Sequence, residues 1–134
     1  MLIYYETVMQ VLVVTSIWID YFKSGLNSEK LDEILDDNRV LTNDIILAEL
    51  IPFLMIRKQQ KIVDLLTNIP LLTLKIDWTE IIQWQVACLN AGINGIGISD
   101  SIIAQNSKQK RSSIYSLDKH FLSLNQVVDI SLFE

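Results

Sequence analysis

Short apolar runs alternate with segments of helical periodicity along most of the chain. The run QVLVV at residues 10–14 is compact and β-branched, which is typical of a central strand covered on both faces. Further candidate strands lie at residues 39–41, 71–74, 95–98, 113–117 and 127–130. Amphipathic segments between them predict helices at about 17–24, 28–36, 44–60, 60–66, 78–91, 100–109 and 118–124. The alternation predicts an α/β fold of three layers, with a mostly parallel sheet of about four or five short strands flanked by helices.

Hydrogen-bonding side chains mark several of these helix boundaries. Thr15 and Ser16 follow the first strand and can cap the next helix, and Thr42 and Asn43 can cap the apolar helix. The residues DWTE at 77–80 have the form of a capping box. Pro52 lies inside the apolar helix, and we expect it to kink or break that helix. Beyond it, the helix is expected to continue through the polar residues RKQQK at 57–61.

Two aspartates follow apolar runs and open helices. Asp100 comes after GIGI, and Asp118 after the strand at 113–117. In the first of these helices, the expected inward residues are Ile102, Ile103 and Ala104, and the expected outward residues are Gln105, Lys108 and Gln109. Both aspartates are N-cap candidates. Because the carboxyl ends of parallel strands face one common crevice, a shared site is the second interpretation.

Bulk properties limit the classes of function. The 134 residues are half apolar and one fifth charged, which fits one globular domain. One cysteine, Cys88, and one histidine exclude a zinc site built from these residue types and favour a reducing, cytoplasmic setting. The apolar run at 45–56 is too short to span a membrane. The net charge of −5 argues against binding nucleic acid by bulk electrostatics.

Glu49 is an acidic residue within this apolar run. An ionised carboxylate there is strongly disfavoured unless it meets a cation or lines a polar cleft. The simpler alternative is a partly exposed side chain on one stripe of the helix. Three carboxylates beside apolar strands and helices, namely Glu49, Asp100 and Asp118, are the type of ligand that a hard divalent cation requires.

Three segments together resemble one known family. VTSIWIDYF at 14–22, LAEL at 47–50 and ISDSIIAQNSKQKRSSIYSLDKHF at 98–121 are similar in order and spacing to PIN domains of the small toxin type found in bacterial type II toxin-antitoxin pairs. The resemblance extends from about Met9 to Phe133. It implies a small α/β protein that assembles acidic residues around Mg²⁺ or Mn²⁺ and hydrolyses RNA phosphodiester bonds.

The resemblance also implies roles for particular residues. It implies catalytic and metal-binding roles for Glu49, Asp100 and Asp118. The polar residues expected beside them are Thr15, Ser16 and Ser116. The basic residues Lys108, Lys110 and Arg111 follow the Asp100 helix, where they can steer the RNA backbone or simply form a solvated helix end.

Val14 is the main departure from the family pattern. PIN domains normally carry an aspartate at this position, directly before the Thr-Ser pair, and valine has no ligand atom. Three interpretations remain open. The substitution disarms a toxin, it marks a natural decayed or regulatory form, or a water shell held by the other carboxylates preserves weak activity.

Two main hypotheses of function follow. The first is a metal-dependent ribonuclease toxin, impaired by Val14, that acts on RNA and pairs with a protein antitoxin. The second is a non-catalytic binding module that engages an antitoxin or forms a homodimer. A phosphatase with an aspartyl nucleophile is disfavoured, because Val14 stands where the nucleophile is needed. Residues 1–8 are predicted to be an N-terminal extension of a single domain at 9–134, and no membrane segment is expected.

The apolar helix around residues 51–56 and the three tryptophans provide more apolar surface than a small monomer needs. Part of it is predicted to form a homodimer or to receive an antitoxin segment. For Trp18, Trp78 and Trp84, ordinary core packing is the alternative.

Overall fold

A parallel sheet forms the centre of the protein in the computed structural model, which describes residues 9–134. The three strands are β1 (Val11–Val13), β2 (Val40–Leu41) and β3 (Ser113–Tyr115). Their order is β2-β1-β3, and β1 is parallel to both neighbours. The predicted extension at residues 1–8 lies outside the described residues.

One isolated bridge widens the sheet at each edge. Thr42 pairs with Leu71 beyond β2, and Ile114 pairs with Leu132 beyond β3. Of the segments predicted as strands, 71–74 therefore contributes one bridge through Leu71, and 127–130 contributes none. Proline at position 70 has no N–H to donate, and Leu132 lies beyond the predicted segment. The α/β class and the parallel pairing are confirmed, with three strands in the described chain.

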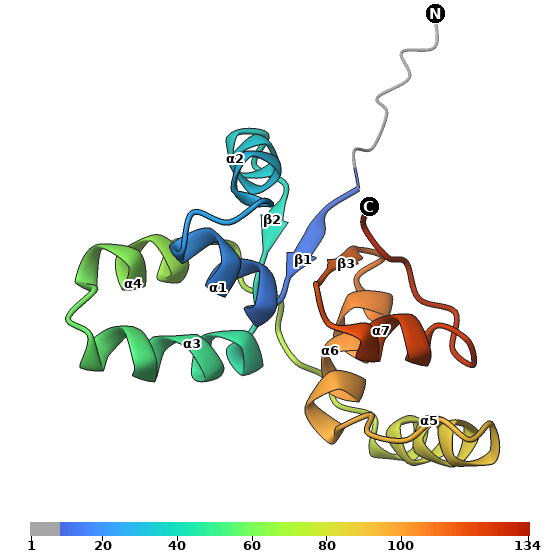
Figure 1. Ribbon diagram of the computed structural model, residues 1–134. Coiled ribbons are helices and arrows are strands. Elements are labelled where there is room, and N and C mark those ends of the chain that lie inside the picture. Colours follow the sequence, from blue (N-terminus) through green and yellow to red (C-terminus); the bar gives the residue numbers. More distant parts are fainter. Residues whose placement is uncertain (1–8) are drawn as a thin grey trace, which may run out of the picture.

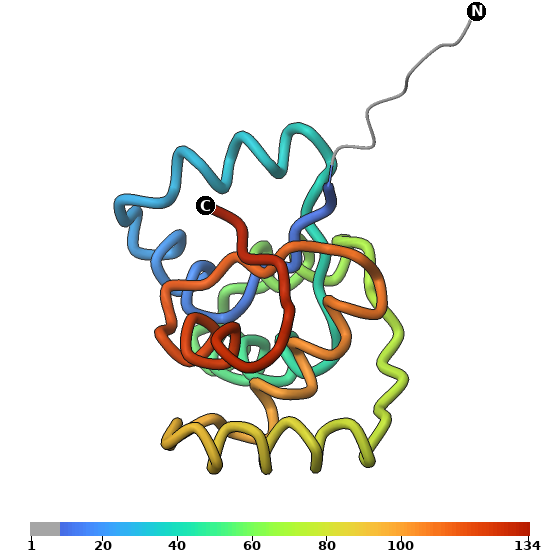
Figure 2. Tube along the Cα trace, turned by 90° about the vertical axis from the view of Figure 1, so that its right-hand side faces the viewer, coloured from blue at the N-terminus to red at the C-terminus, as the bar shows by residue number. Residues whose placement is uncertain are grey.

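Seven helices within residues 9–134 surround these strands. They are α1 (Thr15–Phe22), α2 (Ser28–Asp36), α3 (Asp44–Ile56), α4 (Gln60–Thr67), α5 (Trp78–Asn90), α6 (Ile98–Gln109) and α7 (Lys119–Leu124). Figure 1 shows the strands in the middle, with α1 to α4 gathered on one side and α5 to α7 on the other. In Figure 2, α5 runs along one end of the molecule. No helix within residues 9–134 has the length and apolar character needed to cross a membrane.

Helix α3 differs from its predicted form at two places. It runs through Pro52 without ending there, because the carbonyl that loses its hydrogen bond belongs to Ala48 and both residues are exposed to water. The helix ends at Ile56 rather than continuing through the polar residues. Lys58 has a positive φ of 56°, which turns the chain away from the helix axis.

Helix α1 also begins differently from the prediction. Thr15 is its first residue, Val14 is the N-cap, and no side chain caps the helix. The hydroxyl groups of Thr15 and Ser16 are therefore free for other contacts. The capping prediction is confirmed for Asn43, whose side chain accepts a hydrogen bond from the N–H of Ile46 at 3.0 Å.

Buried amide side chains of α6 hold the segment between α4 and α5. Asn106 donates to the carbonyl of Thr73 at 3.2 Å and accepts from Asn43 at 2.9 Å. Gln105 accepts from the N–H of Asp77 at 3.0 Å and donates to its carbonyl at 3.1 Å. Gln105 was expected to point outward but is 1% exposed, because these hydrogen bonds satisfy its amide inside the protein.

We predict that Asn106→Leu destabilises the protein by about 1 to 3 kcal/mol, because it leaves the buried Asn43 amide without its partner and removes the bond to the Thr73 carbonyl. Urea unfolding followed by circular dichroism measures the change. The matched control is Gln109→Leu on the same helix. Gln109 is exposed, and its single bond to the Lys75 carbonyl should be worth less than about 1 kcal/mol.

Candidate acidic metal site

Asp118 is fixed at the point where β3 leads into α7. It is the N-cap of α7, as predicted, and its Oδ1 accepts from the N–H of His120 at 2.9 Å. Its own N–H donates to the Ser116 hydroxyl at 2.8 Å. Two hydrogen bonds, one on each side of the residue, therefore set the direction of this carboxylate.

Two serines connect this turn to α1. The hydroxyl groups of Ser16 and Ser116 lie 3.4 Å apart. Ser16 Oγ also accepts from the N–H of Leu117 at 2.9 Å. The predicted polar positions Ser16 and Ser116 thus lie beside Asp118, where they hold the backbone of its turn.

Asp100 enters the site from the first turn of a helix, whereas the sequence predicted that it follows a strand. Residues 93–97 contain no strand, and α6 begins at Ile98, so Asp100 lies in the first helical turn and is not the N-cap. Its Oδ2 accepts from the N–H of Gly97, the N-cap residue, at 3.3 Å. An acidic side chain here is stabilised by the free N–H groups at the start of the helix.

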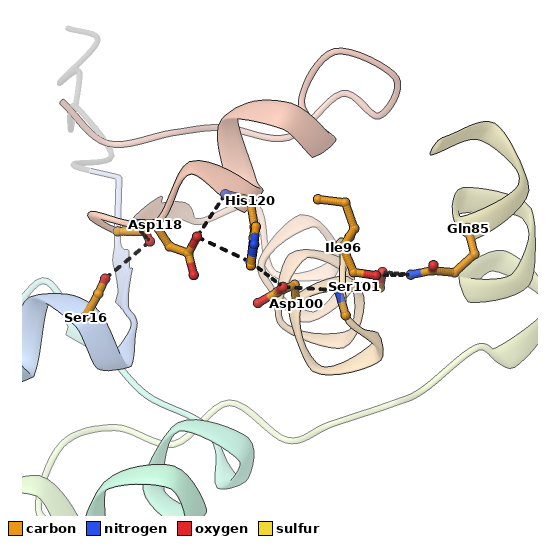
Figure 3. A network of polar contacts seen from close by, with 9 residues as sticks. Ser16, Gln85, Ile96, Asp100, Ser101, Asp118 and His120 are labelled. Carbon is orange, nitrogen blue, oxygen red and sulfur yellow. Dashed lines mark hydrogen bonds and ion pairs between the residues drawn. The ribbon is translucent and has the colours of Figure 1, made fainter. Parts of the chain in front are cut away.

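His120 lies between the two aspartates, as Figure 3 shows. Its Nδ1 is 3.1 Å from Asp100 Oδ2 and 3.3 Å from Asp118 Oδ1. The three side chains offer ligand atoms that all lie within 4.8 Å of one another. From the sequence, the single histidine was used to exclude a zinc site, and its position beside the two aspartates was missed. The available signal was a single histidine in the first turn of the helix that Asp118 caps.

A small crevice of about 50 Å³ joins the predicted positions. Its lining contains Val14, Thr15, Ser16, Glu49, Asp100, Ile103, Asp118 and Phe121. Val14, which is 4% exposed, therefore forms part of the wall of this crevice. The hydroxyl oxygen of Thr15 is buried there and has no hydrogen-bond partner.

Glu49 contributes a third carboxylate from the middle of α3. Its pKa is raised above the ordinary value of 4.5, first by desolvation and second by the negative charge of Asp100. The Thr15 hydroxyl opposes this rise, although its geometry is not that of a formed hydrogen bond. The second cause indicates that the Asp100 carboxylate is close enough to disfavour the charged form of Glu49.

The basic residues lie away from these carboxylates. Lys108, Lys110 and Arg111 are exposed at the other end of α6. The rise of an α-helix between Asp100 and Lys108 is about 12 Å. Lys108 Nζ donates to the carbonyl of Asp129 at 2.5 Å. The structure therefore brings the three predicted acidic residues together but does not bring the basic residues to the same place.

The donor set fits a hard divalent cation in part. Carboxylate oxygens of Asp100 and Asp118 converge on one point, Glu49 lines the same crevice, and the unsatisfied Thr15 hydroxyl lies beside them. Mg²⁺ and Mn²⁺ prefer oxygen ligands of this type. Val14 provides no donor atom, so one wall of the crevice is apolar.

A parallel three-stranded sheet with an acidic crevice at the ends of β1 and β3 is an arrangement of the nuclease-type α/β class. The chain belongs to the PIN domain family, since the family model described as "PIN domain" matches residues 11–126. The family resemblance read from the sequence is thereby confirmed. No curated protein sequence matches the chain significantly.

Solved structures of low sequence identity share this fold. VapBC2 from Rickettsia felis, bound to a DNA fragment from its promoter, is 16% identical with a TM-score of 0.73, covering 93% of this chain and 98% of the other. DNA-bound VapBC from Salmonella typhimurium is 14% identical with a TM-score of 0.72, covering 94% and 98%. FitAcB from Neisseria gonorrhoeae is 21% identical with a TM-score of 0.64, covering 93% and 97%.

We predict that Glu49→Gln stabilises the protein relative to the unmodified chain more at pH 7 than at pH 4. The folded pKa of Glu49 is above its unfolded value, so its favourable contribution is complete below the unfolded pKa and is lost as pH rises through the folded pKa. Urea unfolding of both proteins at the two pH values measures the difference. An equal difference at both pH values would contradict the assignment.

Proposed function

We propose that this protein is a metal-dependent ribonuclease toxin of a toxin-antitoxin pair, with an activity impaired by Val14. The observation that carries the proposal is the convergence of Asp100, Asp118 and Glu49 in one crevice whose remaining wall is Val14. In this proposal the three carboxylates hold Mg²⁺ or Mn²⁺ and act on RNA.

Each residue has a distinct part in such a site. The bound cation would polarise the phosphate and lower the pKa of the attacking water. Asp118 and Asp100 hold it with carboxylates whose directions are fixed by backbone N–H groups. Glu49 lines the same crevice and would be the third carboxylate ligand. Thr15 and Ser16 present hydroxyl groups to the same crevice.

His120 restricts how a cation enters this site. Its Nδ1 faces both aspartates, and in that contact it must donate a proton to a carboxylate oxygen. A cation between Asp100 and Asp118 requires that His120 lose this proton or turn away. The 45% exposure of its side chain leaves room for the second movement.

The surface of α1, α3 and α4 offers a place for an antitoxin segment. A groove of about 570 Å³ is lined by apolar residues of these helices, including Phe22, Leu50, Phe53 and Ile62. Glu49 lines both this groove and the acidic crevice. A segment bound in the groove would therefore lie next to the carboxylates. Lys108, Lys110 and Arg111 remain candidates for contacts with RNA beyond the crevice.

The surface of α5 supports the proposed homodimer. Trp78, Ile82, Val86 and Leu89 follow one another at helical spacing and are 50% to 66% exposed. Trp18 and Trp84 instead belong to the core, at 0% and 9% exposed. The core alternative thus holds for two of the three tryptophans. A continuous apolar face of this kind is typical of a helix that packs against another protein surface.

A non-catalytic binding module is the second candidate function. The observation that favours it is the loss of one ligand at Val14 while both apolar faces are retained. Metal binding separates the two candidates, because a binding module needs no cation. The next prediction tests this difference.

We predict that Val14→Asp raises the affinity for Mn²⁺ and the rate of RNA cleavage by about tenfold or more, because it adds a charge and a ligand to the crevice. Isothermal titration with Mn²⁺ and cleavage of a labelled RNA measure the two effects. The double variant Val14→Asp, Asp118→Asn is the control and should lose both gains.

The same variant distinguishes the two candidate functions. If Val14→Asp folds but binds no Mn²⁺ and cleaves no RNA, the metal-dependent ribonuclease is excluded and the binding module remains. Its folding is checked by circular dichroism, because an aspartate at a position that is 4% exposed destabilises the cation-free protein.

We predict that the protein dimerises through α5 and that Ile82→Glu shifts it to monomer at micromolar concentrations. A charge in the middle of an apolar interface must be desolvated without a partner. Sedimentation or mass photometry across a concentration series measures the mass. Leu26→Glu is the matched control, because Leu26 is fully exposed on a different part of the surface. A monomer at all concentrations of the unmodified chain would exclude the dimer.

A further inference from the structure

One peptide group lies directly behind the Asp100 carboxylate. The N–H of Gly97 donates to Asp100 Oδ2 at 3.3 Å. The carbonyl oxygen of the same peptide group belongs to Ile96 and accepts from Gln85 Nε2 at 3.3 Å. A peptide group is planar, so a contact that holds its oxygen also sets the direction of its N–H. Figure 3 shows this chain of contacts from Gln85 to Asp100.

Gln85 makes a second contact that fixes its own position. Its Nε2 donates to the hydroxyl of Ser101 at 2.8 Å, and Ser101 is fully buried. The amide therefore connects α5, which carries Gln85, to both the loop before α6 and the first turn of α6. The orientation of the amide is determined, because the carbonyl oxygen of Ile96 needs a donor and only the nitrogen provides one.

The loop before Asp100 needs such a support. Val14 directly follows β1, and Asp118 comes three residues after the end of β3, in a turn whose N–H groups are bound by the Ser16 and Ser116 hydroxyls. Asp100 follows residues 93–97, which form no strand. Gly92 and Gly95 have positive φ values of 74° and 84°, a conformation in which glycine is the favoured residue. No sheet hydrogen bond orients the peptide group between Ile96 and Gly97, so a side chain must do so.

We propose that Gln85 is a positioning residue for the metal site, which acts on Asp100 through the peptide group of Ile96 and Gly97. The inference rests on the proposed function, because it assigns Asp100 a cation to hold. A donor on the carbonyl oxygen also polarises the N–H on the other side of the peptide group and strengthens its bond to the carboxylate. Gln85 itself touches neither a cation nor RNA.

The test compares three variants of α5 in the full chain. Gln85→Met keeps the length of the side chain and removes the donor. Gln85→Glu keeps the shape, replaces the donation to Ser101 by an oxygen that can accept from the Ser101 hydroxyl, and places an oxygen against the Ile96 carbonyl. Gln83→Met is the matched control, since Gln83 is exposed on the same helix and makes no side-chain hydrogen bond within residues 9–134. Thermal unfolding establishes that each variant is folded.

Two measurements report on the inference. Hydrogen exchange of the Gly97 amide, measured by NMR without metal, should become about tenfold faster in both Gln85 variants. Paramagnetic broadening by Mn²⁺ should show that both Gln85 variants bind Mn²⁺ about tenfold more weakly. Loss of a group that orients a metal ligand typically weakens metal binding by about 10 to 100 times, and we expect the smaller value. Gln83→Met should change neither value. A role in stability alone would lower the melting temperature without changing the Mn²⁺ affinity of the folded protein.

The outcomes separate this inference from the proposed function. Equal Mn²⁺ binding in Gln85→Met and the unmodified chain, or an unchanged Gly97 amide, overturns the positioning role alone. Absence of Mn²⁺ binding in the unmodified chain and in Val14→Asp overturns the proposed function, and the positioning role falls with it. Weaker binding together with faster Gly97 exchange, found in both Gln85 variants and not in the control, supports both.

Discussion

The gathering of three carboxylates in one crevice is the constraint that the contacts around the site satisfy. Asp100, Asp118 and Glu49 line one crevice, and the negative charge of Asp100 helps to raise the pKa of Glu49. Like charges remain close only where opposite charge or N–H donors compensate them. The compensation here comes from the N–H groups of Gly97 and His120 and from the His120 imidazole. A site held in this way is prepared for a cation.

The scaffold provides these donors at helix starts. Asp118 caps α7 after a strand, whereas Asp100 lies in the first turn of α6 after a loop. The body of α6 is buried from Ser101 to Ser107, and its amide side chains satisfy the backbone of the segment before α5. Hydrogen bonds from the amide side chains of α6 therefore hold this segment, which a further strand would hold in a wider sheet. These hydrogen bonds supplement a sheet of only three short strands in holding together the seven helices of residues 9–134.

Much of the fold and part of the acidic site could be predicted from the sequence, for physical reasons that differ between elements. The apolar run at 10–14 and the Asp118 helix have local signals, a β-branched run and an N-cap, and both were located correctly. The burial of Gln105 has no local signal, because its partner Asp77 lies 28 residues away. The neighbouring Asp118 gave a local signal for His120, but its contact with Asp100 depends on the fold. The hydrophobic periodicity predicted that Gln105 faces solvent, because this pattern reflects hydrophobicity but not hydrogen bonding. The strand expected before Asp100 failed because two glycines with positive φ lie in or beside that segment.

The residue at position 14 affects both the stability of the fold and the affinity of the crevice for a cation. An aspartate at this place would add a fourth carboxylate to a crevice in which two already repel each other, so it would raise the cost of folding without a cation. Valine removes that repulsion and packs against the core at 4% exposure. The same change removes a ligand and lowers the gain in free energy when a cation binds. In the proposed function, valine at this position would therefore favour the stability of the cation-free fold over the binding of a cation.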